Sequence, residues 1–124
     1  MTGATINGEP SALRWYARPV FFVADIQVAI GFYVGRLGFT KKWHEAEGKG
    51  TVCQVDHGEC EIILCQDAAR RDKSRLFIEL TKEGLEQLDR EIAERSISTD
   101  KTWWGYDVTR IVDPDGNELF FPRE

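Results

Sequence analysis

The chain has 124 residues, of which 42% are hydrophobic and 30% charged, a composition typical of one folded domain rather than of a disordered segment. Its formal net charge of −5 argues against sequence-independent binding to nucleic acid, which depends on basic side chains that neutralise phosphates. No apolar run approaches the roughly 20 residues of a membrane span, and residues 1–14 lack a signal-peptide pattern, so a cytoplasmic protein without a membrane partner is expected.

The cysteines are odd in number, at Cys53, Cys60 and Cys65. Their C-x6-C-x4-C spacing differs from that of a zinc knuckle, and no export signal favours a disulfide framework. We therefore predict reduced thiols that mostly act as small buried hydrophobic residues.

The first part of the chain predicts an arm, a strand and a short helix. Residues 1–14 are rich in small and turn-forming types and predict a flexible arm. The β-branched and aromatic run Arg18–Val23 predicts a strand buried on both faces. Asp25 is expected to cap a helix that ends at Gly38. The apolar side chains of this helix fall on one face: Ile26, Ile30, Tyr33 and Leu37.

Three further strands are predicted next, at residues 39–45, 51–56 and 60–66. The connection at residues 47–50 is loose, whereas Gly58 lies in a tight turn where a positive φ is expected.

The same order of elements then begins again. Residues 75–80 predict a strand, and Thr81 is expected to cap a helix that runs to about Arg95. Residues 97–102 predict a weak strand. The last two strands, 108–112 and 118–121, flank Asp-Pro-Asp-Gly, in which proline presets φ and glycine accepts the positive φ that closes a hairpin.

The chain therefore predicts an α+β fold in which a βαβββ module occurs twice, with a period of roughly 55 residues. Residues 1–14 form the arm and residues 15–124 a single domain, with module one at 18–66 and module two at 75–122. Each module has one helix, which covers only one face of its sheet. We expect the two modules to form one curled mixed sheet around a cleft, with the helices on its outer face.

Several short motifs in this arrangement resemble the vicinal-oxygen-chelate superfamily, which includes glyoxalase I, extradiol dioxygenases, and fosfomycin- and bleomycin-resistance proteins. The early motifs are Val23–Ile26, Phe32–Tyr33 and Leu37–Phe39, and the late motifs are Trp104–Gly105 and Asp113–Asn117. The resemblance spans about residues 18 to 122 and supports the same repeated fold.

Enzymes of this superfamily hold a divalent metal through a His or Glu at one inward position on each of four strands. The resemblance places these positions at Arg18, Ile63, Phe77 and Phe120, none of which can ligate a metal. A shift of two residues keeps the same face of a strand and brings in Glu61, Glu79 and Glu118, which would suit Mg²⁺ or Mn²⁺. These carboxylates can equally be rim or solvent residues. His44 and His57 are expected to be exposed residues rather than ligands.

The metal-free pattern is similar to the bleomycin-resistance branch, whose members are acidic homodimers that sequester a cationic glycopeptide antibiotic in clefts between subunits. Trp103 replaces a proline of that branch, and the run from Gly105 to Asp113 is one residue longer, which leaves the ligand open. Stacking aromatic rings and pairing carboxylates are the expected ligand contacts. The candidate ligand-binding residues are Trp43, Phe77, Glu79, Trp103, Trp104, Glu118 and Phe120.

We therefore expect a homodimeric small-molecule-binding protein with no cofactor and no catalytic residues, which sequesters a cationic or aromatic ligand. One alternative is a metal-dependent lyase, isomerase or dioxygenase that uses the carboxylate-rich site. Another is a structural dimer whose cleft has no dedicated ligand, with the aromatic residues serving as core or interface contacts.

Overall fold

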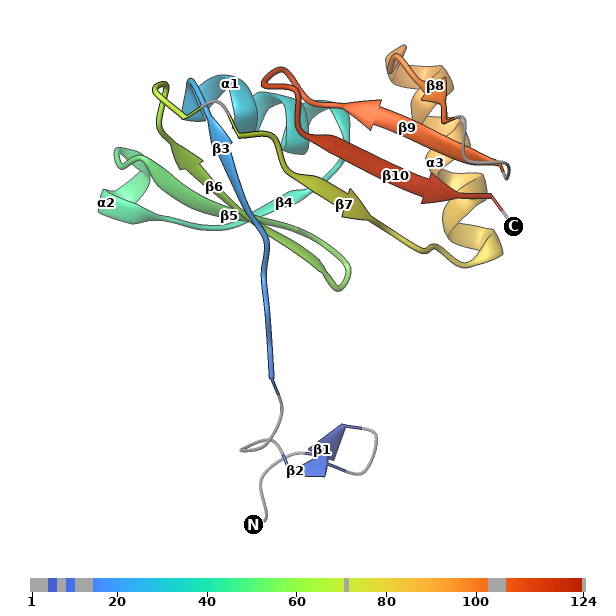
Figure 1. Ribbon diagram of the computed structural model, residues 1–124, viewed down its shortest axis with the longest axis horizontal. Helices are drawn as coiled ribbons and strands as arrows, with labels where there is room; N and C mark the ends of the chain where they lie inside the picture. The colour runs from blue at the N-terminus through green and yellow to red at the C-terminus, as the bar shows by residue number, and fades with distance from the viewer. Residues whose placement is uncertain (1–4, 7–8, 11–14, 71, 103–106, 124) are drawn as a thin grey trace.

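The computed structural model describes the chain except residues 1–4, 7–8, 11–14, 71, 103–106 and 124, and its main body consists of two four-stranded mixed sheets (Figure 1). The first has the order β3-β6-β5-β4, with β3 parallel to β6. Its strands are β3 (Val20–Val23), β4 (Thr40–His44), β5 (Val52–His57) and β6 (Cys60–Gln66). In the N-terminal segment, β1 (Thr5–Ile6) pairs with β2 (Glu9–Pro10).

The second sheet has the order β7-β10-β9-β8, with β7 parallel to β10. Its strands are β7 (Arg75–Phe77), β8 (Asp100–Lys101), β9 (Val108–Val112) and β10 (Glu118–Pro122). Each sheet thus contains one parallel and two antiparallel pairs, in the same order along the chain. The predicted α+β fold with a repeated βαβββ module is confirmed.

The helices begin at the predicted capping residues. The Asp25 carboxylate accepts from the N–H groups of Gln27 and Val28 at 2.9 and 3.2 Å, and α1 (Ile26–Ile30) follows. A wider π-helical segment, η2 (Gly31–Arg36), continues from α1. Gly38 then takes a φ of 79°, as the stop signal predicted.

The second module repeats this pattern. The Thr81 hydroxyl accepts from the N–H of Gly84 at 3.1 Å and caps α3 (Lys82–Arg95). A short helical turn, α2 (Glu45–Gly48), was not predicted; it occupies part of the connection expected to be loose. None of the helices in the described ranges is long and apolar enough to cross a bilayer.

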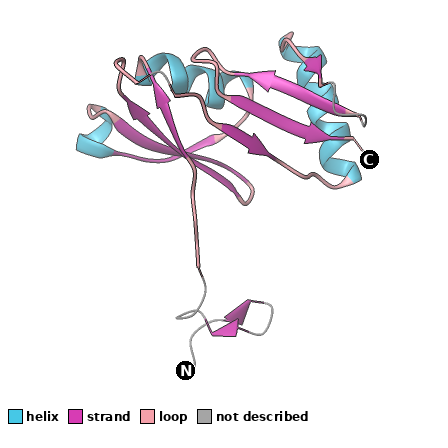
Figure 2. Ribbon diagram, in the orientation of Figure 1, coloured by secondary structure: helices cyan, strands magenta, loops and turns pink. Residues whose placement is uncertain are grey.

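The helices cover one face of each sheet, and the hydrophobic core lies between the two layers (Figure 2). In the first module, strand residues of the core pack against Ala29 and Tyr33, both fully buried. The strand residues of this core are Phe21, Val23, Cys53, Val55, Ile62 and Leu64 in the first sheet and Ile111, Leu119 and Phe121 in the second. In the described part of the chain no helix lies on the opposite face of either sheet, and the candidate residues Trp43, Phe77, Glu118 and Phe120 lie there.

Three strand predictions need correction. The first strand is not buried on both faces, because β3 lies at the edge of its sheet and only one face is covered: Val20 is 41% exposed. The strand predicted for residues 75–80 ends at Phe77, although the N–H of Ile78 still donates to the carbonyl of Phe120 at 2.8 Å. The weak strand at 97–102 is reduced to β8.

A buried carboxylate in the turn between β9 and β10 connects the two modules. Asp113 is 4% exposed, and its Oδ1 accepts from the backbone N–H groups of Asp115 and Asn117 at 2.8 and 2.9 Å. Its Oδ2 accepts from the Asn117 side-chain amide and from the Tyr33 hydroxyl, both at 2.9 Å. Tyr33 belongs to the first module, so a residue of each module meets at this carboxylate.

The same turn makes further bonds toward the first sheet. The Asn117 side chain accepts from the N–H of Ser74 at 2.8 Å and donates to the carbonyl of Phe22 at 3.3 Å. The Asp115 carboxylate accepts from the N–H of Ala24 at 2.8 Å. Gly116 has a φ of 88°, which explains the glycine in the motif. Side chains of the second module therefore satisfy backbone groups at the end of β3.

Tyr33→Phe should lower the free energy of unfolding by about 1–3 kcal/mol, because it leaves the buried Asp113 carboxylate short of one donor. Burial and the neighbouring Asp113 raise the pKa of Tyr33 well above its ordinary value, so the hydroxyl keeps its proton and donates. Urea unfolding of both proteins measures the difference. The control Val28→Ala, at a side chain 53% exposed on α1, should change stability by less than about 0.5 kcal/mol.

Candidate functional site

The uncovered face of the first sheet is organised around one buried amide. Gln54 is 2% exposed, and its Oε1 accepts from Nη1 of Arg18 at 2.6 Å and from Nε1 of Trp43 at 2.9 Å. Its Nε2 donates to Asp56 at 2.8 Å and to Glu61 at 3.1 Å. Every hydrogen-bonding position of the amide is therefore used, which orients the indole ring and both carboxylates.

Sequence reasoning found Trp43 but missed Gln54. The indole ring stays partly open to solvent, with Trp43 39% exposed, although its N–H is satisfied. In the sequence, Gln54 stands out only as a polar residue between Cys53 and Val55, which are both buried. This position does not reveal which side chains bond to its amide. A shift in register between Lys41 and Trp43 places Trp43 opposite Gln54.

The uncovered face of the second sheet is organised around Glu118. Its Oε1 accepts from Nε of Arg75 at 2.7 Å, and its Oε2 accepts from Nε of Arg110 at 2.6 Å. Arg110 also pairs with Asp100 at 2.7 Å. Burial favours a raised pKa for Glu118, but the hydrogen bonds and charges of Arg110 and Arg75 outweigh it and lower the pKa. Glu118 is thus an ionised carboxylate held between two guanidinium groups.

The four positions that the sequence resemblance assigned to metal ligands, Arg18, Ile63, Phe77 and Phe120, lie on or beside these uncovered faces, with Arg18 in the segment just before β3. Ile63 pairs across the strands with Val20 and Gln54, and Phe77 pairs with Phe120. Arg18 reaches the same face through its hydrogen bond to Gln54. An aliphatic, two aromatic and one guanidinium side chain thus occupy the four positions, and none of these groups is a metal ligand.

The carboxylates of the shifted register do not assemble into a metal site within this chain. In the part of the chain that the structure describes, no three His, Cys, Asp or Glu side chains come together so that they could hold a metal ion. Glu61 is bonded to Gln54, and Glu118 is bonded to two arginines. The carboxylates of Glu61 and Glu118 are therefore bonded to neighbouring side chains and do not form an open cation site.

A groove of about 560 Å³ brings together part of the predicted site. Phe77 and Glu79 line it from the second module, and Glu61 lines it from the first. Tyr16 and Pro19 form another wall of the groove. The groove therefore combines an aromatic residue that is 44% exposed, Phe77, with three acidic residues, because Glu59 also lines it.

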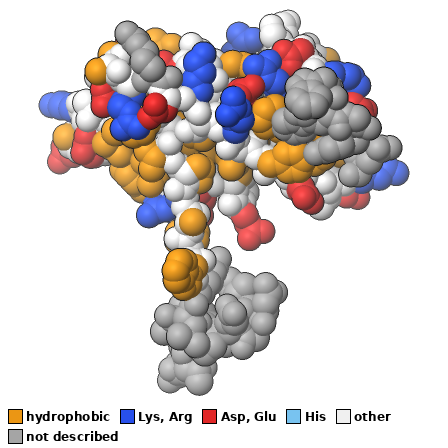
Figure 3. Space-filling view, viewed as in Figure 1, with side chains coloured by type: hydrophobic (Ala, Val, Ile, Leu, Met, Phe, Trp, Pro, Cys, Tyr) orange, Lys and Arg blue, Asp and Glu red, His pale blue; other side chains and the backbone are white. Residues whose placement is uncertain are grey.

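The other predicted residues lie elsewhere. Glu118 and Phe120 line a second hollow of about 570 Å³, together with Arg75 and Arg110. Trp43 belongs to the Gln54 cluster, and Trp103 and Trp104 lie outside the described residues. The space-filling view shows hydrophobic side chains exposed between charged ones (Figure 3). The candidate site is therefore divided between separate surfaces of one chain.

The histidines behave differently from each other. His57 is exposed, as predicted, and its ring packs edge-on against Phe39 with ring centroids 5.4 Å apart. His44 is half-buried instead of exposed, because its Nε2 lies 2.8 Å from the carbonyl oxygen of Gly50.

Comparison with known proteins gives a family match and solved structures with a similar fold. The family model described as "Glyoxalase/Bleomycin resistance protein/Dioxygenase superfamily" matches residues 15–121. No curated protein sequence matches the chain. The fold is similar to that of solved structures with low sequence identity, which supports the fold alone.

Two of these structures are bleomycin-binding proteins. One, in complex with bleomycin, has 18% identity and a TM-score of 0.69, with 90% of this chain and 99% of that chain covered. The other, from Streptomyces verticillus in complex with copper(II)-bleomycin, has 21% identity and a TM-score of 0.69, with 90% and 98% covered. A lactoylglutathione lyase from Agrobacterium tumefaciens has 13% identity and a TM-score of 0.64, with 89% and 94% covered.

Glu118→Gln should lower the free energy of unfolding at pH 7 by about 1–3 kcal/mol, because two arginines lose a charged acceptor. Since the folded-state pKa of Glu118 is lowered, its contribution is present above the unfolded pKa of about 4.3 and is lost as the pH falls. The two proteins should therefore converge in stability at acid pH. Urea unfolding at several pH values measures this, with Glu86→Gln on the exposed face of α3 as the control. A constant difference between pH 7 and pH 3 would contradict the ion-pair explanation.

Proposed function

The chain belongs to the glyoxalase/bleomycin resistance protein/dioxygenase superfamily, and we propose that it is a metal-independent protein that sequesters a cationic or aromatic small molecule. The observation that carries the proposal is the chemistry of four positions on or beside the uncovered faces, Arg18, Ile63, Phe77 and Phe120. Enzymes of the superfamily need His or Glu there to hold a metal, and these four side chains cannot replace them. Ligand binding without metal chemistry fits these side chains.

The groove beside β7 supports a ligand with an aromatic and a cationic part. Phe77 offers a partly exposed ring on which a flat ligand can stack. Glu61 and Glu79 lie in the same groove and offer carboxylates to a positive group. Trp43, held by Gln54 on the neighbouring face, supplies a second partly exposed ring.

Glu118 was predicted to contact the ligand, but in the proposed function it mainly holds two arginines. Both of its oxygens accept from arginine, so a cationic ligand would have to compete with Arg75 and Arg110. An ion pair between Glu118 and a cationic ligand stays a prediction. We propose that Glu79 makes the main ion pair with such a ligand. Phe120, which is 5% exposed, contributes as a wall of the hollow rather than as an open stacking surface.

A homodimer fits the distribution of exposed apolar side chains. Val20, Trp43 and Phe77 are 41%, 39% and 44% exposed on the faces that no helix covers. Trp15, just before the first sheet, is 96% exposed. A second copy placed over these faces would remove apolar surface from water and convert open grooves into a closed cleft.

The structural neighbours indicate a first ligand to test. Two of them are bleomycin-binding proteins in complex with bleomycin or its copper form. Their identity to this chain is 18% and 21%, so the ligand is carried over only as a candidate. Other cationic aromatic compounds belong in the same panel.

We expect protein purified without chelator to contain less than a stoichiometric amount of metal, and we expect bleomycin or another cationic aromatic compound to raise its melting temperature. A ligand at a hundredfold excess over Kd stabilises the native state by about 2.7 kcal/mol. Phe77→Ala and Glu79→Gln should each weaken binding by about tenfold, or 1.4 kcal/mol. Elemental analysis, thermal melts and titration calorimetry measure these quantities.

The matched controls are Val28→Ala and Glu86→Gln, which change exposed side chains on α1 and α3 and should leave Kd unchanged. One tightly bound divalent ion per chain, or stabilisation by a single ion among Mg²⁺, Mn²⁺, Zn²⁺ and Ni²⁺, would contradict metal independence. A panel that leaves the melting temperature unchanged would contradict sequestration of this class of ligand.

A further inference from the structure

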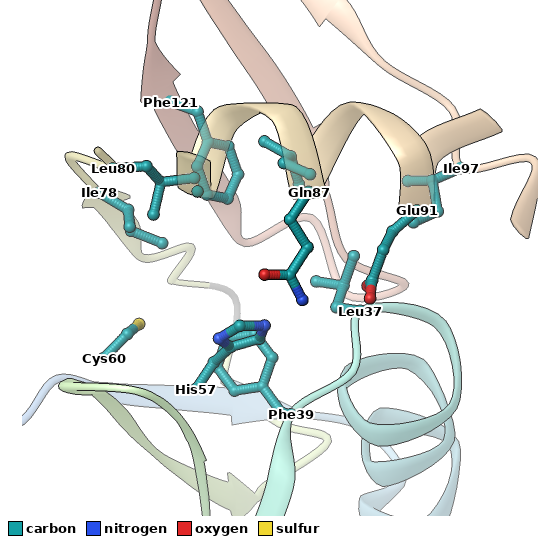
Figure 4. Close-up of a pocket in the computed structure, with 12 residues that line it drawn as sticks. Leu37, Phe39, His57, Cys60, Ile78, Leu80, Gln87, Glu91, Ile97 and Phe121 are labelled. Carbon is teal, nitrogen blue, oxygen red and sulfur yellow. The ribbon is translucent and has the colours of Figure 1, made fainter. Parts of the chain in front are cut away.

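A cavity of about 90 Å³ lies where the two modules meet, on the helix side of the sheets (Figure 4). The first module contributes residues after η2 and at the tip of the β5–β6 hairpin, and the second contributes α3 and the segment that follows β7. Phe121, which faces the helix layer, forms part of the wall. The cavity therefore lies on the helix side of the sheets, where it adjoins the groove beside β7.

The interior of the cavity is apolar, and its polar groups are few. Leu37, Phe39, Leu80, Ile97 and Phe121 form most of the wall. Burial raises the pKa of the Cys60 thiol to about 11, so the thiol in the wall is uncharged at neutral pH. A dry cavity of this kind favours an apolar guest over water, because water needs several polar partners.

Three polar side chains from different segments gather at one side of the cavity. Gln87 and Glu91 extend from α3, and the Gln87 amide points toward the ring of His57 on the hairpin (Figure 4). The Glu91 carboxylate lies 3.5 Å from the Arg95 guanidinium and keeps a side-chain exposure of 20%. This rim thus offers hydrogen-bond acceptors from an amide oxygen and a carboxylate.

The helix that lines the cavity is only partly buried. None of the residues of α3 is fully buried, and the apolar side chains of its inner stripe, Leu85, Leu88 and Ile92, are all half-buried. Wall atoms that face an empty space lose the dispersion contacts that a packed neighbour would supply. A guest in the cavity would restore these contacts and should therefore bind with favourable free energy.

A route into the cavity is present. The cavity and the groove beside β7 share five lining residues, which are His57, Cys60, Ile78, Leu80 and Gly84. Because the groove is open to solvent and adjoins the cavity, a small molecule can enter without separation of the two modules. A larger molecule would be stopped by the apolar walls.

We propose that this cavity is a second binding site, which takes a small single-ring apolar molecule that carries one hydrogen-bond donor. The space of about 90 Å³ is smaller than the roughly 150 Å³ cavity that holds benzene, so a guest of one ring fits by extending partly into the adjoining groove, and a larger guest does not fit. The apolar walls select the ring. The Glu91 carboxylate and the Gln87 amide oxygen accept from its donor, and the negative charge of Glu91 disfavours an anionic guest.

The test compares phenol, toluene and benzoate, which share one ring and differ in the polar group. Phenol should bind with the lowest Kd, toluene more weakly because it lacks the donor, and benzoate weakest because its charge opposes Glu91. Ligand-observed NMR titrations give the three Kd values, and thermal melts give the accompanying stabilisation. No binding by any of the three, or benzoate binding as tightly as phenol, would overturn the proposal.

Two variants locate the site. Leu88→Phe narrows the cavity, which Leu88 lines without lining the groove, and should weaken phenol binding by at least about tenfold. Val28→Phe, an enlargement on the exposed face of α1, should leave phenol binding unchanged. Glu91→Gln keeps the shape of the side chain and should reduce the preference for phenol over benzoate. It carries the test if Leu88→Phe does not fold. Phenol binding that survives Leu88→Phe but is lost in Phe77→Ala or Trp43→Ala would place the site on the uncovered faces and refute the cavity.

Discussion

The buried carboxylate of Asp113 is the constraint on which the arrangement of the two modules depends. An ionised group at this depth is tolerated only if donors surround it, and four do: two backbone N–H groups, the Asn117 amide and the Tyr33 hydroxyl. Proline and glycine shape the turn so that the backbone donors converge. Tyr33 must then approach from the first module, so the same carboxylate that closes a hairpin also positions one sheet beside the other.

Once the modules are fixed in this way, the two uncovered faces acquire different electrostatic characters. Gln54 on the first face holds two carboxylates, Asp56 and Glu61, and one guanidinium. Glu118 on the second face holds two guanidinium groups. One face therefore presents mainly acceptors and the other mainly donors, although both are built from the same βαβββ plan. A ligand that spans both faces would meet opposite charges at its two ends.

Sequence reasoning succeeded where a structure is determined by neighbours in the chain. The caps at Asp25 and Thr81, the stop at Gly38 and the hairpin turn at Gly116 all depend on residues a few positions apart. It failed where the outcome depends on distant segments. The exposure of Val20 follows from the place of β3 at a sheet edge, and the burial of Gln54 follows from partners on other strands and before β3. The candidate residues that the structure describes lie in a groove, a hollow and the Gln54 cluster of one chain, and their assembly into the predicted dimer cleft stays a prediction.

The proposal that these surfaces bind a ligand without a metal defines what their side chains must supply. A metal ion binds a substrate oxygen strongly at a single point, whereas stacking and ion pairing need area and exclusion of water. Trp43 and Phe77 keep 39% and 44% of their surface exposed, so in one chain a charge pair or a stacked ring would remain largely solvated. Closure by a second copy, or by a ligand large enough to cover both rings, would lower the local dielectric and strengthen each contact. In the proposed function, binding without a metal and closure by a covering partner are therefore linked.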